Sequence, residues 1–112
     1  RLQISTEITL PEDLSLAQAA GHLPHLAEDL WQQIQRKNVE AKSVTLKLKT
    51  HDFRIITRSL TYSSVLPDSG ALLRAAQTLA GRIPPQREDA FRLIGLGVAH
   101  LVPKDQQQSL WR

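Results

Sequence analysis

Basic and hydroxyl side chains gather in one stretch of this 112-residue sequence, residues 36–58. Seven Lys and Arg residues lie there against two acidic residues, a balance of +5, whereas the remaining seven basic and nine acidic residues give −2. Within the stretch, Lys47 and Lys49 alternate with apolar residues and project on the same side as Thr45. Ammonium and hydroxyl groups are the donors that phosphate oxygens accept from, so the pattern predicts a polyanion-binding surface. A solvated sheet face is the alternative.

The sequence lacks the residue patterns of common catalytic and metal sites. It has no Cys, which excludes disulfides and thiolate metal ligands. His22 and His25 are three residues apart, but no carboxylate or third His accompanies them in a known ligand spacing. There is no Gly-rich phosphate loop, no G-x-S-x-G and no H-E-x-x-H. We therefore expect this chain to bind a partner, not to catalyse, and to need no cofactor of its own.

Length and composition fit one globular domain. The chain is 41% hydrophobic and 22% charged, which is enough apolar material for a core. The uncharged, apolar stretch of residues 93–103 is too short to cross a bilayer, so we expect no membrane contact. Because the chain does not begin with Met, we expect it to be a piece of a longer protein. We also expect the domain to be monomeric and the protein to be located in the cytoplasm.

Four runs have the character of β-strands. Strict alternation over residues 44–49 predicts a strand with one apolar and one basic face. Residues 54–61 follow after a short connection, so the two runs predict an antiparallel hairpin, whose second strand would bring Thr57, Arg58 and Ser59 near the basic face. A further run spans residues 91–102, and another spans residues 3–10, which we expect Pro11 to end.

Two stretches have helical periodicity. Apolar residues recur every three or four positions over residues 16–34, with a capping box at Ser15 and Gln18. Pro24 cannot lie in a helix interior, so we expect a short turn and then a helix from about Pro24 to Lys37. The second helix begins near Asp68 or Ser69 and stops before residues 84–85, both proline.

The element order β-α-β-β-α-β predicts an α+β domain over residues 1–102. We expect a four-stranded, antiparallel-containing sheet with two helices packed on one face and the other face open. Residues 103–112 have no periodicity and predict a flexible C-terminal tail. Gly95 and Gly97, in the last predicted strand, permit a close backbone approach, which either a structural contact or a ligand would explain.

Several of these strings resemble the little finger domain of Y-family DNA polymerases, closest to the bacterial DinB type. They are residues 41–49 (AKSVTLKLK), followed by Asp52 and Phe53 and by residues 57–59 (TRS), then residues 92–98 (RLIGLGV) and residues 7–10 (EITL). The resemblance covers nearly the whole chain, and the order and spacing of the strings carry it.

The resemblance implies a domain that docks beside the primer-template duplex, with its open sheet face along the major groove and its contacts on both backbones. Where the family often has a Lys-Ser-Ile-Gly-Arg type run, this chain has Gln3-Ile4-Ser5-Thr6, which supplies hydroxyls in place of cations. Family members use Mg²⁺ held by palm carboxylates, which lie outside this chain. The DNA-binding residues predicted from the basic face and from the resemblance are Ser5, Thr6, Lys42, Thr45, Lys47, Lys49, Thr57, Arg58 and Ser59.

Residues 107–111 (QQSLW) resemble the pentapeptide that binds the bacterial sliding clamp, the DNA polymerase III beta subunit. That pattern runs Gln, any residue, Ser or Asp, Leu, then an aromatic residue or Leu. The resemblance implies that Gln107, Ser109, Leu110 and Trp111 contact the clamp.

The sequence predicts a duplex-DNA-binding and clamp-tethering domain of a translesion DNA polymerase. A family homologue that has lost its catalytic carboxylates and acts as an accessory protein would share every feature of this chain. An independent RNA-binding α/β module is a third possibility, and a preference for single-stranded RNA over duplex DNA would favour it.

Overall fold

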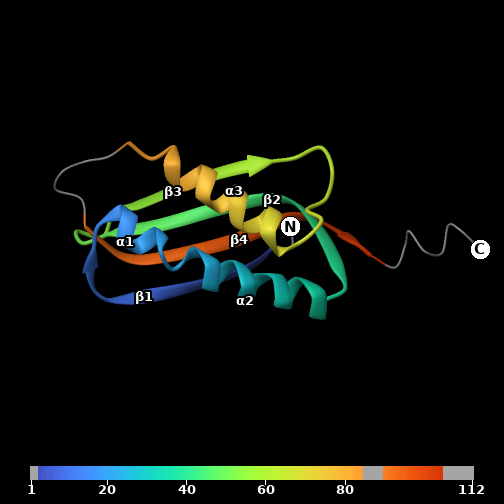
Figure 1. Cartoon of the computed structure of the whole chain (residues 1–112), viewed down its shortest axis with the longest axis horizontal. Coiled ribbons are helices and arrows are strands. Elements are labelled where there is room, and N and C mark those ends of the chain that lie inside the picture. The colour runs from blue at the N-terminus through green and yellow to red at the C-terminus, as the bar shows by residue number, and fades with distance from the viewer. Residues whose placement is uncertain (1–2, 85–89, 105–112) are drawn as a thin grey trace, which may run out of the picture.

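The computed structural model describes residues 3–84 and 90–104 and has the predicted α+β architecture (Figure 1). The strands pair in the order β1-β4-β2-β3, and every pairing is antiparallel. In chain order the elements are β1 (Ile4–Leu14), α1 (Leu16–Ala20), α2 (Leu23–Arg36), β2 (Val39–Thr50), β3 (Ile55–Thr61), α3 (Ser69–Gly81) and β4 (Phe91–Pro103).

The helices begin where local side chains satisfy their free N–H groups. Ser15 accepts from the Gln18 N–H while the Gln18 side chain accepts from the Ser15 N–H, so the predicted capping box starts α1. Pro24 lies in the first turn of α2, where its missing N–H costs nothing, and the predicted break before it is confirmed. Asp68 caps α3 by accepting from the Ala71 N–H at 2.8 Å.

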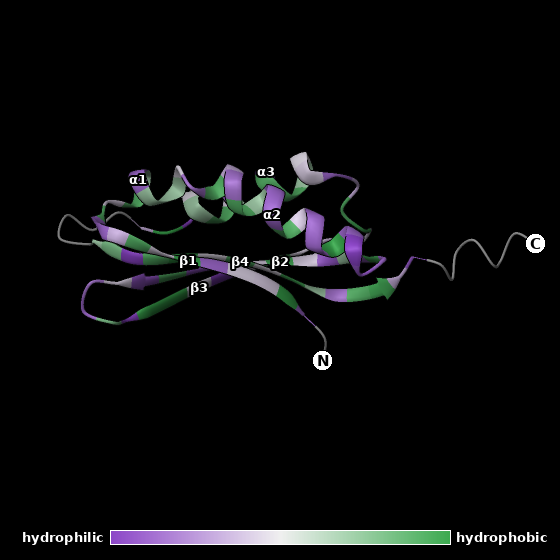
Figure 2. Cartoon of the chain, turned by 90° about the horizontal axis from the view of Figure 1, so that it is seen from below, coloured by the Kyte–Doolittle hydropathy of each residue, from purple (hydrophilic) through white to green (hydrophobic). Residues whose placement is uncertain are grey.

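The helices form one layer and the sheet another, so the core lies between them (Figure 2). The periodic residues of α2 are buried, among them Leu23, Leu30 and Ile34, and they face the alternating residues Leu46 and Leu48 of β2. The helices of the described residues cover only one face of the sheet, as the sequence predicted, and none of them lies on the opposite face (Figure 2). Among the described residues, no helix is long and apolar enough to cross a membrane.

The first strand is longer than expected. Pro11 does not end it, because β1 continues to Leu14 through an irregularity in the register between Thr9 and Leu14. The reason is its place in the sheet. β1 is an edge strand, where a residue without an N–H removes no ladder hydrogen bond that a central strand would need.

Candidate nucleic-acid interface

The uncovered side of the sheet, called the open face below, is built from every second residue of the four strands. The register aligns Ser5, Gly97, Thr45 and Ser59 in one row across β1, β4, β2 and β3. The next row aligns Glu7, Gly95, Lys47 and Thr57, and the row after it brings Lys49 opposite Ile55 and Leu93. The open face is therefore lined by hydroxyl groups, two lysines and Glu7, with Ile55 and Leu93 toward one end and two glycines along β4.

A shallow groove of about 340 Å³ runs over the first two rows, those of Ser5 and Glu7. Its floor is the β4 backbone at Gly95, Leu96 and Gly97, since the two glycines place no side chain there. The Gly95 position is tight, because a Cβ there would lie 2.8 Å from the Glu7 Cβ and 3.1 Å from the Thr6 carbonyl oxygen. The glycine therefore lets β1 approach β4 closely, which is the structural explanation for the residue type.

Charges on the open face are arranged across this groove. Lys47 Nζ lies 3.4 Å from Glu7 Oε1 above Gly95, and both side chains are about half exposed to solvent. An ion pair between exposed side chains is weak, so a stronger anion can compete for the lysine. Lys49 makes no ion pair with any of the described residues. Thr45 Oγ1 and Ser59 Oγ share a hydrogen bond of 2.7 Å, which fixes both hydroxyls at the surface.

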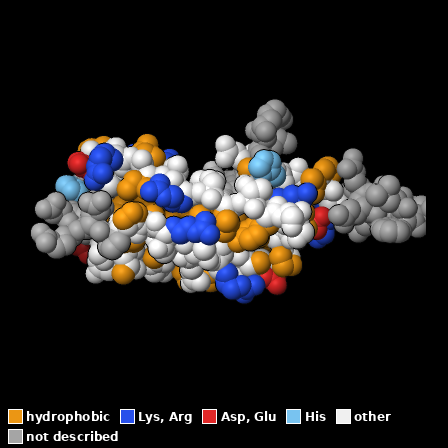
Figure 3. Space-filling model, turned by 90° about the horizontal axis from the view of Figure 1, so that it is seen from above, with side chains coloured by type: hydrophobic (Ala, Val, Ile, Leu, Met, Phe, Trp, Pro, Cys, Tyr) orange, Lys and Arg blue, Asp and Glu red, His pale blue; other side chains and the backbone are white. Residues whose placement is uncertain are grey.

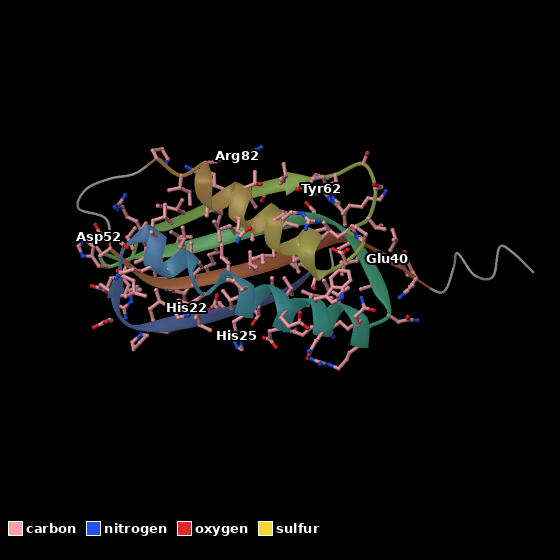
Figure 4. All side chains as sticks on the ribbon, in the orientation of Figure 1. His22, His25, Glu40, Asp52, Tyr62 and Arg82 are labelled. Carbon is pink, nitrogen blue, oxygen red and sulfur yellow. The ribbon has the colours of Figure 1, made fainter. Side chains whose placement is uncertain are left out.

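The surface on the β3 side of the molecule is basic as well (Figure 3). Lys and Arg side chains form a band over its middle, whereas the Asp and Glu side chains in view lie toward its rim. At one end of the molecule the β2–β3 turn holds Asp52 (Figure 4), whose pKa is lowered because the Thr50 hydroxyl donates to it and the Arg54 guanidinium lies beside it. The Phe53 ring in the same turn stacks under Arg92, 4.4 Å from the ring centroid.

The structure brings six of the nine predicted DNA-contact residues onto the open face. The side chains that share it come from three strands: Ser5, Thr45, Lys47, Lys49, Thr57 and Ser59. Lys42 lies farther along β2, opposite His100 of β4, beside a second groove described below.

The other two predicted residues lie on the helix-covered face. Arg58 aligns with the buried Leu46, and its Nη1 donates to the Thr57 carbonyl at 2.8 Å. The expectation that it lies beside the basic face is wrong, because neighbouring residues of a strand point to opposite sides. Thr6 is corrected for the same reason, since its Oγ1 donates to Asp29 of α2 at 3.1 Å.

No metal site is found in residues 3–84 and 90–104, where no three His, Asp or Glu side chains come together. His22 and His25 lie at the start of α2 in the helix layer, away from the open face (Figure 4). The predicted tail contacts, Gln107, Ser109, Leu110 and Trp111, lie outside the described residues. Sequence reasoning missed Glu7 as the partner of Lys47, because the two residues are forty positions apart and only the register joins them.

Comparison with known proteins gives consistent results. The family model described as impB/mucB/samB family C-terminal domain matches residues 1–110. The chain is 83% identical over 111 residues to DNA polymerase IV of Neisseria meningitidis serogroup C, covering 99% of this chain and 32% of the relative. It is 38% identical over 95 residues to DNA polymerase IV of Xanthomonas axonopodis pv. citri, covering 85% of this chain and 26% of that relative. The chain thus spans between a quarter and a third of the length of these relatives.

Solved structures share the fold. A Y-family DNA polymerase chimera, Dbh-Dpo4(243-245)-Dbh, superposes with a TM-score of 0.77 at 14% identity over 92% of this chain and 29% of the other. The little finger domain of PolIV in a complex with the beta-clamp processivity factor gives a TM-score of 0.71 at 20% identity, over 91% of each chain.

Proposed function

Because this chain belongs to the impB/mucB/samB family C-terminal domains and is the little finger domain of a Y-family DNA polymerase, we propose that its open face binds the backbone of duplex DNA. The observation that carries the proposal is the composition of that face. None of the described helices covers it, two lysines and a set of hydroxyls line it, and Glu7 is already paired with Lys47.

The chemistry of the open face favours phosphates over bases. Thr45, Ser59 and Thr57 offer hydroxyls, and Lys47 and Lys49 offer ammonium groups, which together fix a duplex in place without reading its sequence. Aromatic side chains for stacking bases are absent from the described rows of the open face, which argues against a single-stranded RNA platform. The domain therefore binds duplex DNA with little sequence preference.

The Glu7–Lys47 pair sets the strength of this contact. A phosphate that binds Lys47 replaces the Glu7 carboxylate, so breaking the existing ion pair offsets part of the attraction between the phosphate and the lysine. Lys49, with no such partner among the described residues, is available without that exchange. We infer that Lys49 makes the earlier and stronger contact of the two.

The C-terminal residues provide the second part of the proposed function. A related little finger domain has been solved with a beta-clamp processivity factor, and residues 107–111 of this chain match the pentapeptide pattern of clamp ligands. A short peptide binds weakly by itself, but a DNA-bound domain holds it near the clamp and raises its effective concentration. The clamp would then keep the polymerase at the primer end.

The parent protein of this domain is proposed to be a translesion DNA-directed DNA polymerase of the bacterial cytoplasm. Its similarity to DNA polymerase IV of Neisseria supports this. The Mg²⁺ ions of such an enzyme would be held by carboxylates outside this chain, so the domain contributes binding and not catalysis.

The DNA contact is tested by the salt dependence of binding. Replacing Lys47 and Lys49 together with Ala should flatten the slope of log affinity against log salt by about one to two, because each neutralised phosphate contributes about −0.9. The matched control replaces Lys37 and Arg74 of the helix layer with Ala, which removes the same charge from the covered side. Equal slopes for both double variants would refute the assignment of the open face, and tighter binding to single-stranded RNA than to duplex DNA would favour an RNA-binding module.

A further inference from the structure

A second groove, of about 430 Å³, lies beyond the open face at the opposite end of the sheet from the β2–β3 turn. It is lined by side chains of β2, β3 and β4, namely Lys42, Thr61, His100, Leu101 and Val102. Glu40 and Tyr62 mark this end of the molecule in Figure 4, while Asp52 marks the other. The groove thus combines an ammonium, an imidazole and a hydroxyl over a short apolar wall.

The backbone is irregular at His100, which lines this groove. His100 has a φ of 54°, which is unusual for a residue other than glycine, and its side chain is exposed. The pairing of β2 with β4 runs from Ala41 and Leu101 to Ser43 and Ala99, so Lys42 and His100 stand opposite each other at this point.

The alternation of β2 changes at the same place. Ala41 and Val44 both belong to the core although they are three residues apart, which a regular strand does not permit. At this irregularity Lys42 is half-buried, whereas Ser43 is buried and its hydroxyl is bonded to that of Thr61 at 2.8 Å.

The lining of the groove suits a phosphate diester. Histidine changes its charge between about pH 5 and pH 8, and a protonated imidazole and an ammonium that line the same groove both attract an anion. Among residues 3–84 and 90–104, no acidic side chain lines the groove. The other charged or titratable groups near it in the register are Glu40 on β2, Tyr62 after β3 and Lys104 after β4, and none of them forms an ion pair with Lys42 in the described part of the chain.

We propose that Lys42, His100 and Thr61 form a second phosphate site for the DNA backbone, whose occupancy strengthens as His100 becomes protonated. Lys42 is five residues from Lys47, or about 17 Å along a strand, so the two lysines must contact different phosphates. The inference rests on the proposed function, because the phosphate belongs to the same duplex that lies on the open face. It adds a pH dependence that Lys47 and Lys49 do not supply.

The experiment compares duplex binding by the 112-residue chain at about pH 6 and about pH 8. The wild-type slope of log affinity against log salt should be steeper at the lower pH by about 0.9, the contribution of one more phosphate contact. His100→Asn should abolish this difference, and Asn is the suitable replacement because it tolerates a positive φ. His51→Asn, at the exposed turn outside the groove, is the matched control and should keep the difference. Equal melting temperatures of the variants exclude unfolding.

A titration with inorganic phosphate separates this proposal from the proposed function. At about pH 6, phosphate should shift the NMR signals of Lys42 and His100 more than chloride at equal ionic strength does. If the wild-type chain binds duplex DNA but His100→Asn retains the pH difference, the second phosphate site is wrong while the open face stands. If the wild-type chain binds no duplex at all, the proposed function fails, and the phosphate titration alone decides whether the groove binds anions.

Discussion

Gly95→Ala tests whether the glycine of β4 serves the packing of β1 or leaves room for a ligand. The added Cβ would lie 2.8 Å from the Glu7 Cβ, whereas carbon atoms in contact prefer about 3.5 to 4.0 Å. β1 must therefore move by about 1 Å, and its core residues Ile4 and Leu10 must move with it.

The expected cost follows from two opposing effects. Overpacking of this kind costs about 1 to 3 kcal/mol. Replacing a glycine in a strand with alanine stabilises the fold by about 0.5 to 1 kcal/mol, because it lowers the conformational entropy of the unfolded chain. Gly95→Ala should therefore lower the free energy of unfolding by about 0.5 to 2 kcal/mol, measured by urea denaturation.

Two other glycines provide a graded control. A Cβ at Gly97 would lie 3.3 Å from the Ser5 Cβ, so Gly97→Ala should cost less than Gly95→Ala. A Cβ at Gly81, the last residue of α3, would meet nothing within 4 Å, so Gly81→Ala should be neutral or stabilising by up to about 1 kcal/mol. The reasoning is refuted if Gly95→Ala is as stable as the wild type. A variant of unchanged stability that binds DNA more weakly would show that the glycine serves the groove.

Two further predictions concern the core and the tail. Leu46→Ala and Leu79→Ala should each lower the free energy of unfolding by about 2 to 5 kcal/mol, because both side chains are buried between the helices and the sheet. Thermal or urea denaturation measures this loss. A loss below about 1 kcal/mol would contradict the packing. Truncation after Asp105 should abolish clamp binding and leave the melting temperature unchanged, because Leu110 and Trp111 are expected to act as anchors on a partner. Clamp binding retained by the truncated chain argues against the pentapeptide.

The sequence was sufficient to predict the layers because each element has a clear period. The alternation around Leu46 and the helical spacing from Leu23 to Ile34 both identify a buried side, and two buried sides must face each other. The length of β1 was not predictable from Pro11 alone. A proline is tolerated or excluded according to whether its strand lies at an edge, and that depends on the order of the sheet.

The composition of the site was harder to predict because it depends on register. Thr57, Arg58 and Ser59 are consecutive, so a strand can place only the first and third on one face, and the structure places Arg58 on the other. Thr6 follows the same rule, being two residues from Ile4 and from Ile8 on the covered side of β1. The positive φ of His100 has no signal in the sequence, since neither glycine nor asparagine stands there.

An acid on a surface proposed to bind DNA has a consequence for the strength of that binding. Glu7 lies beside Lys47 in the row across Gly95, so a phosphate that reaches the lysine also approaches a carboxylate. The carboxylate opposes the phosphate once the ion pair is broken, and the duplex is held less tightly than the number of cations suggests. A domain with the proposed function would release and rebind the backbone as a primer grows, and contacts that are individually weak would allow this. Firm attachment would then come from the proposed clamp contact of residues 107–111, which does not slow movement along the duplex.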